Sequence, residues 1–180
     1  SVTVTGPLTA DGLYSVAISA VDKAGNTAST TGDFTFDDTV PTATPDLVAT
    51  SDSFGAGTTG TDADNLTKDV RPTFEVATGE PAGASVLAEI LNSSSVVVAT
   101  ATLQTDAAGN VSFQPGADLA AGDYTLRVTP TDKAGNTGSA VDLAFTVDTS
   151  TAVAFTGVSV DSFGADTTGT GTDRLLNDTT

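Results

Sequence analysis

The chain repeats itself at an interval of roughly 110 residues, and no other feature of the sequence limits its fold as strongly. The string Asp-Lys-Ala-Gly-Asn-Thr occupies residues 22–27 and returns at residues 132–137. The string Asp-Ser-Phe-Gly-Ala begins at Asp52 and again at Asp161. Two separate matches at nearly one offset indicate a tandem array, in which one folded unit recurs along the chain.

The second match fixes the phase of the array, because it continues past its first five residues. The further matched pairs are Asp64 with Asp173, Leu66 with Leu175, and Asp69 with Asp178. We therefore predict that residues 1–40 are the C-terminal part of one repeat, that residues 41–149 are a complete repeat, and that residues 150–180 begin another. Fragments of two or three strands are marginal in water, so we expect both partial repeats to belong to a longer chain or to an assembly.

Residue usage and turn signals predict an all-β unit. Thr, Ser, Ala, Val, Asp and Gly dominate the sequence. β-branched residues favour strands, Gly and Asp favour tight turns, and no segment has a convincing helical pattern. Short runs bounded by turn residues give seven candidate strands in the complete repeat, at residues 42–49, 71–77, 85–91, 96–103, 110–114, 123–131 and 140–148.

Alternation of apolar and polar residues along these strands predicts the core. The inward side chains are expected to be Phe74, Val76, Phe113, Tyr124, Leu126, Val128, Phe145 and Val147. Tyr14 and Tyr124 each follow a Gly-containing turn, which matches the tyrosine corner of immunoglobulin-like sandwiches; an ordinary core tyrosine is the alternative. The predicted fold class is therefore all-β, with immunoglobulin-like antiparallel β-sandwich repeats in tandem.

The charge balance excludes several classes of partner. Asp and Glu together number 23 against 6 for Lys and Arg, which gives a formal net charge of −17. Nucleic acids and anionic membrane surfaces are recognised by clustered cations, so we expect neither as a partner. Nearly all the acids are Asp rather than Glu. This bias favours turns and metal coordination over a merely solubilising surface, although a simple soluble or halotolerant surface is the alternative.

The inventory of reactive side chains argues against an enzyme. The chain has no His and no Cys, so it lacks the usual neutral-pH base, thiolate nucleophile and imidazole ligand. No nucleophile elbow or phosphate-binding Gly loop is present, and nothing singles out one pair of carboxylates for glycoside chemistry. No apolar run approaches the roughly 18 residues of a membrane span. We expect no membrane insertion, and any targeting signal to lie outside this segment.

Five motifs mark the course of the repeat: Ser51-Asp-Ser-Phe-Gly, Arg71-Pro-Thr-Phe74, Asp106-Ala-Ala-Gly-Asn110, Asp132-Lys-Ala-Gly-Asn136 and Val147-Asp-Thr149. They resemble motifs of the bacterial immunoglobulin-like repeats of giant surface adhesins and biofilm-associated proteins, including adhesins of the RTX type. The resemblance covers essentially the whole chain. It departs at residues 93–95, where three Ser replace a more usual Gly-containing hairpin, and at Thr151, which stands where the previous junction has Pro41.

Acidic residues gather near the predicted boundaries between repeats. We expect the hairpin that joins the last two strands of a repeat to lie at the pole where the chain leaves for the next repeat. The first loop of the following repeat would then meet it there. Crowded carboxylates repel one another, and Ca²⁺, which takes about 6 to 8 oxygen ligands, relieves that repulsion. The resemblance implies the same, because related adhesin repeats hold Ca²⁺ at their junctions.

The sequence thus predicts two calcium sites built from ten Asp. One site joins Asp22 and Asp38 to Asp52, Asp64 and Asp69, and the other joins Asp132 and Asp148 to Asp161, Asp173 and Asp178. A purely structural turn explains the Asp-Lys-Ala-Gly-Asn-Thr string equally well, because Asp and Asn are common hairpin residues. The loop pattern of an EF-hand is absent.

These observations favour a structural extender in a secreted adhesin on the bacterial cell surface, with neighbouring repeats of the same chain as its partners and Ca²⁺ as a stiffening ion. It would project a distal binding domain whose ligand this segment does not identify. A ligand-binding module for a glycan or protein is a second hypothesis and requires a concave or aromatic exposed patch. A subunit of an extracellular filament or surface layer is a third, which exposed apolar edges would favour.

Overall fold

The computed structural model describes residues 8–52, 61 and 63–150, and in this part of the chain all regular structure is β. The strands are β1 (Gly12–Val21), β2 (Thr27–Phe36), β3 (Thr44–Leu47), β4 (Leu66–Thr67), β5 (Phe74–Ala77), β6 (Ser85–Asn92), β7 (Val97–Gln104), β8 (Asn110–Phe113), β9 (Gly122–Thr131) and β10 (Val141–Val147). The predicted all-β class is confirmed. No helix long and apolar enough to cross a membrane is found in the described residues.

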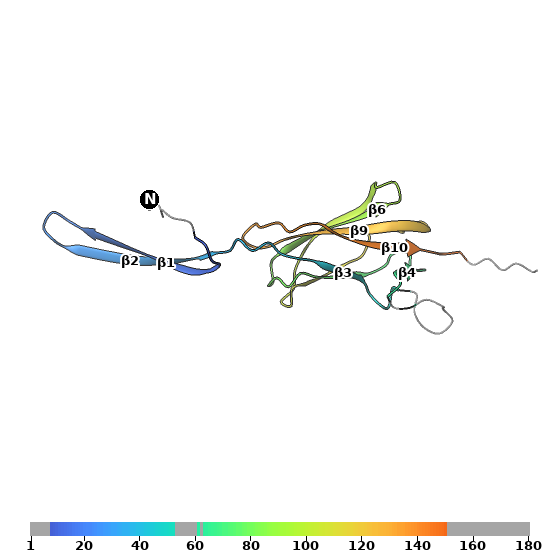
Figure 1. Ribbon diagram of the computed structural model, residues 1–180, viewed down its shortest axis with the longest axis horizontal. Coiled ribbons are helices and arrows are strands. Elements are labelled where there is room, and N and C mark those ends of the chain that lie inside the picture. Colours follow the sequence, from blue (N-terminus) through green and yellow to red (C-terminus); the bar gives the residue numbers. More distant parts are fainter. Residues whose placement is uncertain (1–7, 53–60, 62, 151–180) are drawn as a thin grey trace, which may run out of the picture. The chain divides into compact units, whose positions relative to one another are not determined.

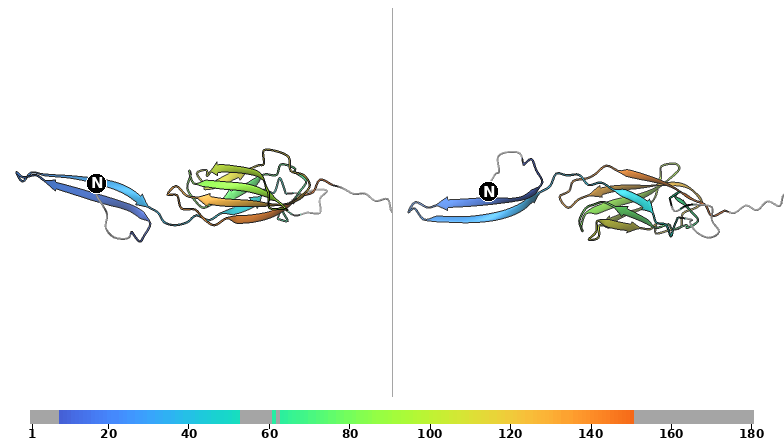
Figure 2. Two further views of the ribbon diagram at one scale, coloured as in Figure 1. Left: turned by 90° about the horizontal axis from the view of Figure 1, so that it is seen from above. Right: turned by 60° about the horizontal axis from the view of Figure 1, so that its bottom comes forward.

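Strands β3 to β10 form a sandwich of two sheets (Figures 1 and 2). One sheet has the order β4-β10-β9-β6-β7, and the other has the order β3-β5-β8. Each of the seven predicted strands has a counterpart, but β4 was not predicted. It has only two residues, and it pairs in parallel with β10 through Leu66 opposite Thr146 and Thr67 opposite Val147. Two residues are too few to display an alternating pattern.

The core lies between the two sheets. Of the predicted core residues, Tyr124 is only partly buried, and the other seven are buried. Burial alternates along β5, where Phe74 and Val76 are inside while Glu75 and Ala77 are exposed. The strand pattern did not single out several further core side chains. These are Leu47, Val86, Ala88, Ile90, Val111 and Leu119.

Both tyrosines form the predicted corner. The Tyr124 hydroxyl donates a hydrogen bond of 2.9 Å to the carbonyl oxygen of Ala120. The Tyr14 hydroxyl donates one of 2.7 Å to the carbonyl oxygen of Ala10. In each case the bond reaches back four residues and ties a strand start to the turn before it. The same device in both repeats supports their common architecture.

Strands β1 and β2 pair antiparallel in register from Gly12 opposite Phe36 to Val21 opposite Thr27. Tyr14 stacks on Phe34 with ring centroids 5.7 Å apart. Phe34 remains 38% exposed and Ile18 42% exposed. This is the exposure expected for the last two strands of a sandwich when no second sheet covers them.

The hairpin between β6 and β7 compensates for its missing glycine. Ser95 takes a positive φ of 60°, at the position that Gly109 and Gly135 occupy in two other turns, with φ of 83° and 97°. The register then shifts, because Leu91 pairs with Val97 while Ile90 pairs with Ala99. Val98 is therefore an extra residue on β7, a β-bulge. The unusual serine turn thus alters the register where the sequence departs from the resemblance.

Candidate functional site

The linker between the two repeats, residues 37–43, is held by the repeat that follows it. The side-chain amide of Asn136 donates a hydrogen bond of 3.0 Å to the carbonyl oxygen of Asp37. Gly138 lies so near the linker that a Cβ atom built on it would be 2.0 Å from the carbonyl oxygen of Pro41. Pro41 and Ala43 are both buried. The connection between β9 and β10 therefore fixes the path by which the chain enters the sandwich.

The Asp that opens each last hairpin is used to build the turn. In the first repeat, the Asp22 carboxylate accepts hydrogen bonds from the backbone N–H groups of Ala24 and Asn26, at 2.8 and 2.9 Å, and from the Asn26 side chain at 2.7 Å. These bonds, that of the Asn26 side chain above all, hold the pKa of Asp22 below its usual value. Its carboxylate oxygens are thus engaged within the turn.

Asp132 makes the equivalent turn in the complete repeat. It accepts from the backbone N–H groups of Gly135 and Asn136 at 2.7 and 2.8 Å, and from the Asn136 side chain at 2.8 Å. Desolvation acts to raise the pKa of Asp132, but these hydrogen bonds outweigh it and the pKa is lowered. Asp106 accepts from two backbone N–H groups in the same way. The same pattern of an Asp that accepts from the backbone of its own turn thus also occurs at Asp106. This favours a structural role for these Asp residues in the turn over a role as metal ligands.

Acidic residues of the first repeat lie close together at the linker. The backbone N–H of Asp38 donates to the Asp11 carboxylate at 2.8 Å, and the Thr39 hydroxyl donates to its other oxygen. These bonds, that of Thr39 above all, lower the pKa of Asp11. The pKa of Asp38 is raised by its side-chain hydrogen bond with Asp11 and by the charges of Asp11 and Asp37. The predicted residue Asp38 therefore interacts directly with Asp11.

The loop between β3 and β5 brings Asp52 and Asp64 into contact. Asp52, only 3% exposed, accepts a hydrogen bond of 3.2 Å from the backbone N–H of Asn65. Asp64 accepts from the backbone N–H groups of Thr61 and Leu66 at 2.9 and 3.1 Å. These two bonds are the main cause of the lowered pKa of Asp64, and a side-chain hydrogen bond with Asp52 adds to them.

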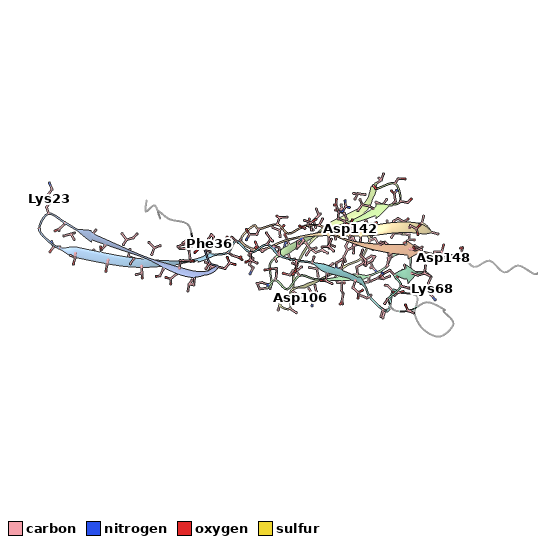
Figure 3. The ribbon with its side chains drawn as sticks, in the orientation of Figure 1. Lys23, Phe36, Lys68, Asp106, Asp142 and Asp148 are labelled. Carbon is pink, nitrogen blue, oxygen red and sulfur yellow. The ribbon has the colours of Figure 1, made fainter. Side chains whose placement is uncertain are left out.

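Asp69 and Asp148 lie at the same end of the sandwich as that pair. Asp69 is 3.4 Å from the Ser51 hydroxyl, and its backbone N–H donates to the hydroxyl of Thr67 at 2.9 Å. The backbone N–H of Asp148 donates to the carbonyl oxygen of Thr67 at 2.7 Å. Figure 3 shows Asp148 and Lys68 together at this end, with Asp106 at the other. The chain leaves the sandwich here.

The structure corrects the expected grouping of the acids. The turn that contains Asp132 precedes β10 and Asp148 follows it, so the length of β10, about 20 Å at roughly 3.4 Å per residue, separates them. Asp22 and Asp38 are likewise at opposite ends of β2, as the labels of Lys23 and Phe36 in Figure 3 show. The reason is geometric. A hairpin turn lies at the start of the second strand, whereas the chain leaves from that strand's end.

Asp52 and Asp64 meet as the sequence predicted, but Asp22, Asp38 and Asp132 do not join the groups to which they were assigned. Asp132 lies near the linker that contains Asp38, because its turn partner Asn136 binds Asp37. Asp148 lies beside the loop of its own repeat that contains Asp52, Asp64 and Asp69. The predicted ligands Asp161, Asp173 and Asp178, and the junction residue Thr151, lie outside the described residues, as does the partial repeat to which they were assigned.

The end at which the chain leaves the sandwich after β10 is called the exit end. The oxygen atoms there are of the type that calcium prefers as ligands. Ca²⁺ binds carboxylate and carbonyl oxygens, and the carboxyl groups of Asp52 and Asp64 are near enough to share a hydrogen bond. Within residues 8–52, 61 and 63–150, no three acidic side chains are grouped closely enough to form a metal site. The residues thus fit the ion in chemistry, with two carboxylates as the core of any site.

Three junction residues escaped the sequence-based selection. Asp11, Asn136 and Gly138 make the contacts that define the linker. A signal for Asn136 existed, because it belongs to a string that occurs twice. Nothing in the sequence marks Gly138, since its role depends on a backbone that lies almost a hundred residues earlier in the chain.

Comparisons with known proteins identify the two parts of the chain. A family model described as a bacterial Ig-like domain matches residues 39–149. A second model with the same description matches residues 2–38. No curated protein matches the sequence.

Solved structures with similar folds include the tetra-tandem repeat in the extending region of a large adhesion protein. It is 25% identical, with a TM-score of 0.45, over 77% of this chain and 32% of that one. CopC from Methylosinus trichosporium OB3b is 20% identical, with a TM-score of 0.38, over 47% of this chain and 82% of its own. Dimeric latent PorU from Porphyromonas gingivalis is 14% identical, with a TM-score of 0.39, over 79% of this chain and 13% of its own. At these TM-scores none of the three supports a functional inference.

Proposed function

Since the chain belongs to the bacterial Ig-like domain family, we propose that it is an extender, a non-catalytic spacer in an RTX-type adhesin on a bacterial cell surface. The docked linker is the observation that carries this proposal. A spacer must keep successive domains in line, and a linker held by Asn136 and covered at Pro41 has little freedom to bend. The net charge of −17 and the absence of His and Cys agree with a spacer that neither binds nucleic acid nor catalyses a reaction.

The stiffness of the linker can be measured directly. The chain has no native Cys, so spin labels can be placed at Ser19→Cys on β1 and Ser112→Cys on β8. We expect a narrow distribution of distances between the labels in pulsed electron resonance. Replacing Asn136 by Ala should broaden it, because the bond to the Asp37 carbonyl is lost.

Asn26→Ala is the matched control, because Asn26 closes the same kind of turn without contacting the linker 37–43. It should leave the distribution narrow. A broad distribution in the unmodified chain, or equal broadening by both variants, would contradict the extender function.

We further propose that Ca²⁺ binds at the exit end, where Asp52 and Asp64 form the core of the site and Asp69 and Asp148 lie nearby. The lowered pKa of Asp64 favours its charged form, and a cation there would replace the proton through which the two carboxyl groups share a hydrogen bond. Both ends of each repeat carry acids, so Ca²⁺ at the exit would stiffen the passage to the next repeat. Extracellular calcium modules bind at about 10⁻⁴ to 10⁻³ M, so that external calcium fills the site.

Calcium is therefore expected to stabilise the chain. At a free concentration of about 100 times the Kd, binding to the folded state alone contributes about 2.7 kcal/mol. Calorimetric titration with CaCl₂ and thermal unfolding with CaCl₂ or EDTA measure this effect. Asp64→Asn should abolish most of it, whereas Asp46→Asn, an exposed acid on β3, should preserve it. Absence of both binding heat and thermal shift at about 10 mM CaCl₂ would reduce these acids to a solvated surface.

A further inference from the structure

In the part of the sandwich that the structure describes there are four edge strands, and three of them are protected against pairing with another chain. β3 contains Pro45 and Asp46, β4 has two residues, and β8 has four. Short length, proline and charge are the usual means by which proteins prevent association through an open edge. The fourth edge, β7, has eight residues and carries neither proline nor charge.

The surface around β7 is also apolar. Val96, Val97 and Val98 are 56%, 44% and 46% exposed. Residues 93–105 contain no charged side chain, in a chain whose net charge is −17. The bulge at Val98 disturbs one end of the strand, but residues 99–104 pair regularly with β6. A regular edge of six residues therefore faces outward beyond the bulge.

A groove lies between this edge and the end of the second sheet. It has a volume of about 450 Å³ and is lined by residues 98–101 of β7, by Phe113 at the end of β8, and by residues 114, 116 and 117 after it. On the regular part of β7, Ala99, Ala101 and Leu103 pack against the core, whereas Thr100 and Thr102 are exposed. Small and hydroxylated side chains allow two backbones to approach, and Thr–Thr pairs stabilise antiparallel strands.

We propose that β7 is the surface by which two copies of this chain associate, through antiparallel pairing of their β7 strands. Two strongly negative chains approach each other most readily where few carboxylates are presented, and β7 itself carries none, with Glu89 of β6 lying opposite Thr100. A basic partner would instead be drawn to the acidic loops. Antiparallel pairing relates the two copies by a two-fold axis, so residues 99–104 of one copy lie against the same residues of the other.

This association goes beyond the extender function and does not depend on it. It would join neighbouring adhesin stalks side by side and continue the five-stranded sheet from one copy into the other. Because repulsion between the two negative chains opposes it, association should strengthen as salt shortens the Debye length from about 10 Å at 0.1 M to about 3 Å at 1 M.

Sedimentation equilibrium of the full chain across this salt range tests the proposal. We expect a monomer–dimer equilibrium whose Kd falls as salt rises. Thr100→Lys should weaken the dimer on the order of tenfold, because it places a cation on each side of the paired edge. The direction of the change in Kd is informative. A lysine also reduces the net negative charge, and that effect alone would strengthen association.

Two variants separate β7 from other surfaces. Ser112→Lys makes the same charge change on β8 and should not weaken the dimer. Phe34→Ser alters the exposed face of β1–β2 and should leave the dimer intact. A chain that is monomeric throughout, even one that binds an extended peptide from another protein at β7, would overturn the proposal. So would a dimer that Phe34→Ser abolishes while Thr100→Lys has no effect, or one that both lysine variants weaken equally.

Discussion

Replacing Phe74 by Ala should lower the free energy of unfolding of the sandwich by about 3–5 kcal/mol. Phe74 is fully buried on β5. Its ring lies 6.4 Å from that of Phe113 on β8 and 4.9 Å from that of Phe145 on β10. It therefore contacts both sheets, and its removal leaves a cavity between layers that cannot close without moving one of them. Urea denaturation followed by circular dichroism gives the difference directly.

Phe34 supplies the matched control. It is also an aromatic residue on a strand, but it is 38% exposed and stacks on Tyr14 rather than filling a core. Phe34→Ala should leave the unfolding of the sandwich nearly unchanged. Since domains of this size are stable by about 5–15 kcal/mol, Phe74→Leu provides a milder variant if Phe74→Ala does not fold. Equal losses for Phe74→Ala and Phe34→Ala would contradict the assignment of the core.

Gly138→Ala should have the second largest effect, with a loss of about 2–3 kcal/mol, the upper part of the range for overpacking. The added Cβ would lie 2.0 Å from the carbonyl oxygen of Pro41 and 3.1 Å from Cγ of Pro130. The first contact is with backbone, which cannot rotate away as a side chain can. Either the sandwich is strained or the linker leaves its place. Denaturation measures the loss of stability caused by strain in the sandwich. Hydrogen exchange of the backbone amides in residues 37–43 measures whether the linker has left its place.

Gly116→Ala controls for the change itself, because nothing lies within 4 Å of a Cβ atom at that position. Its stability should be unchanged or slightly increased, since alanine restricts the unfolded chain. If Gly138→Ala also proves neutral in stability and leaves linker exchange unchanged, the linker is not held as the structure indicates.

The strands and most of the core could be predicted because their signals are local. Phe74 and Val76 alternate with exposed neighbours on β5, and such alternation is visible in a few residues. The tyrosine corner could be predicted because its turn, its strand and its hydrogen-bond acceptor lie within four residues of one another. Tyr124 proved only half-buried because its hydroxyl reaches out of the core to that acceptor.

The arrangement of the acids could not be predicted from spacing alone. Asp22 and Asp38 are near in sequence but lie at opposite ends of β2, whereas Asn136 and Asp37 are distant in sequence and in contact. Which pole a loop occupies depends on strand direction and sheet order, not on proximity along the chain. The tandem repeat correctly indicated that acids recur near each boundary, but not which of them face each other.

The parallel pairing of β4 with β10 has a mechanical consequence. Once tension has separated β3 from β5, it pulls β4 toward the entry of the sandwich and β10 toward its exit. Parallel neighbours pulled from opposite ends are loaded in shear, so the bonds from the backbone N–H groups of Thr146 and Asp148 to the carbonyl oxygens of Asn65 and Thr67 bear the force together. A hairpin pulled at its open end would instead break one bond at a time. We therefore expect β4, the shortest strand of the sandwich, to resist unfolding of the domain under tension.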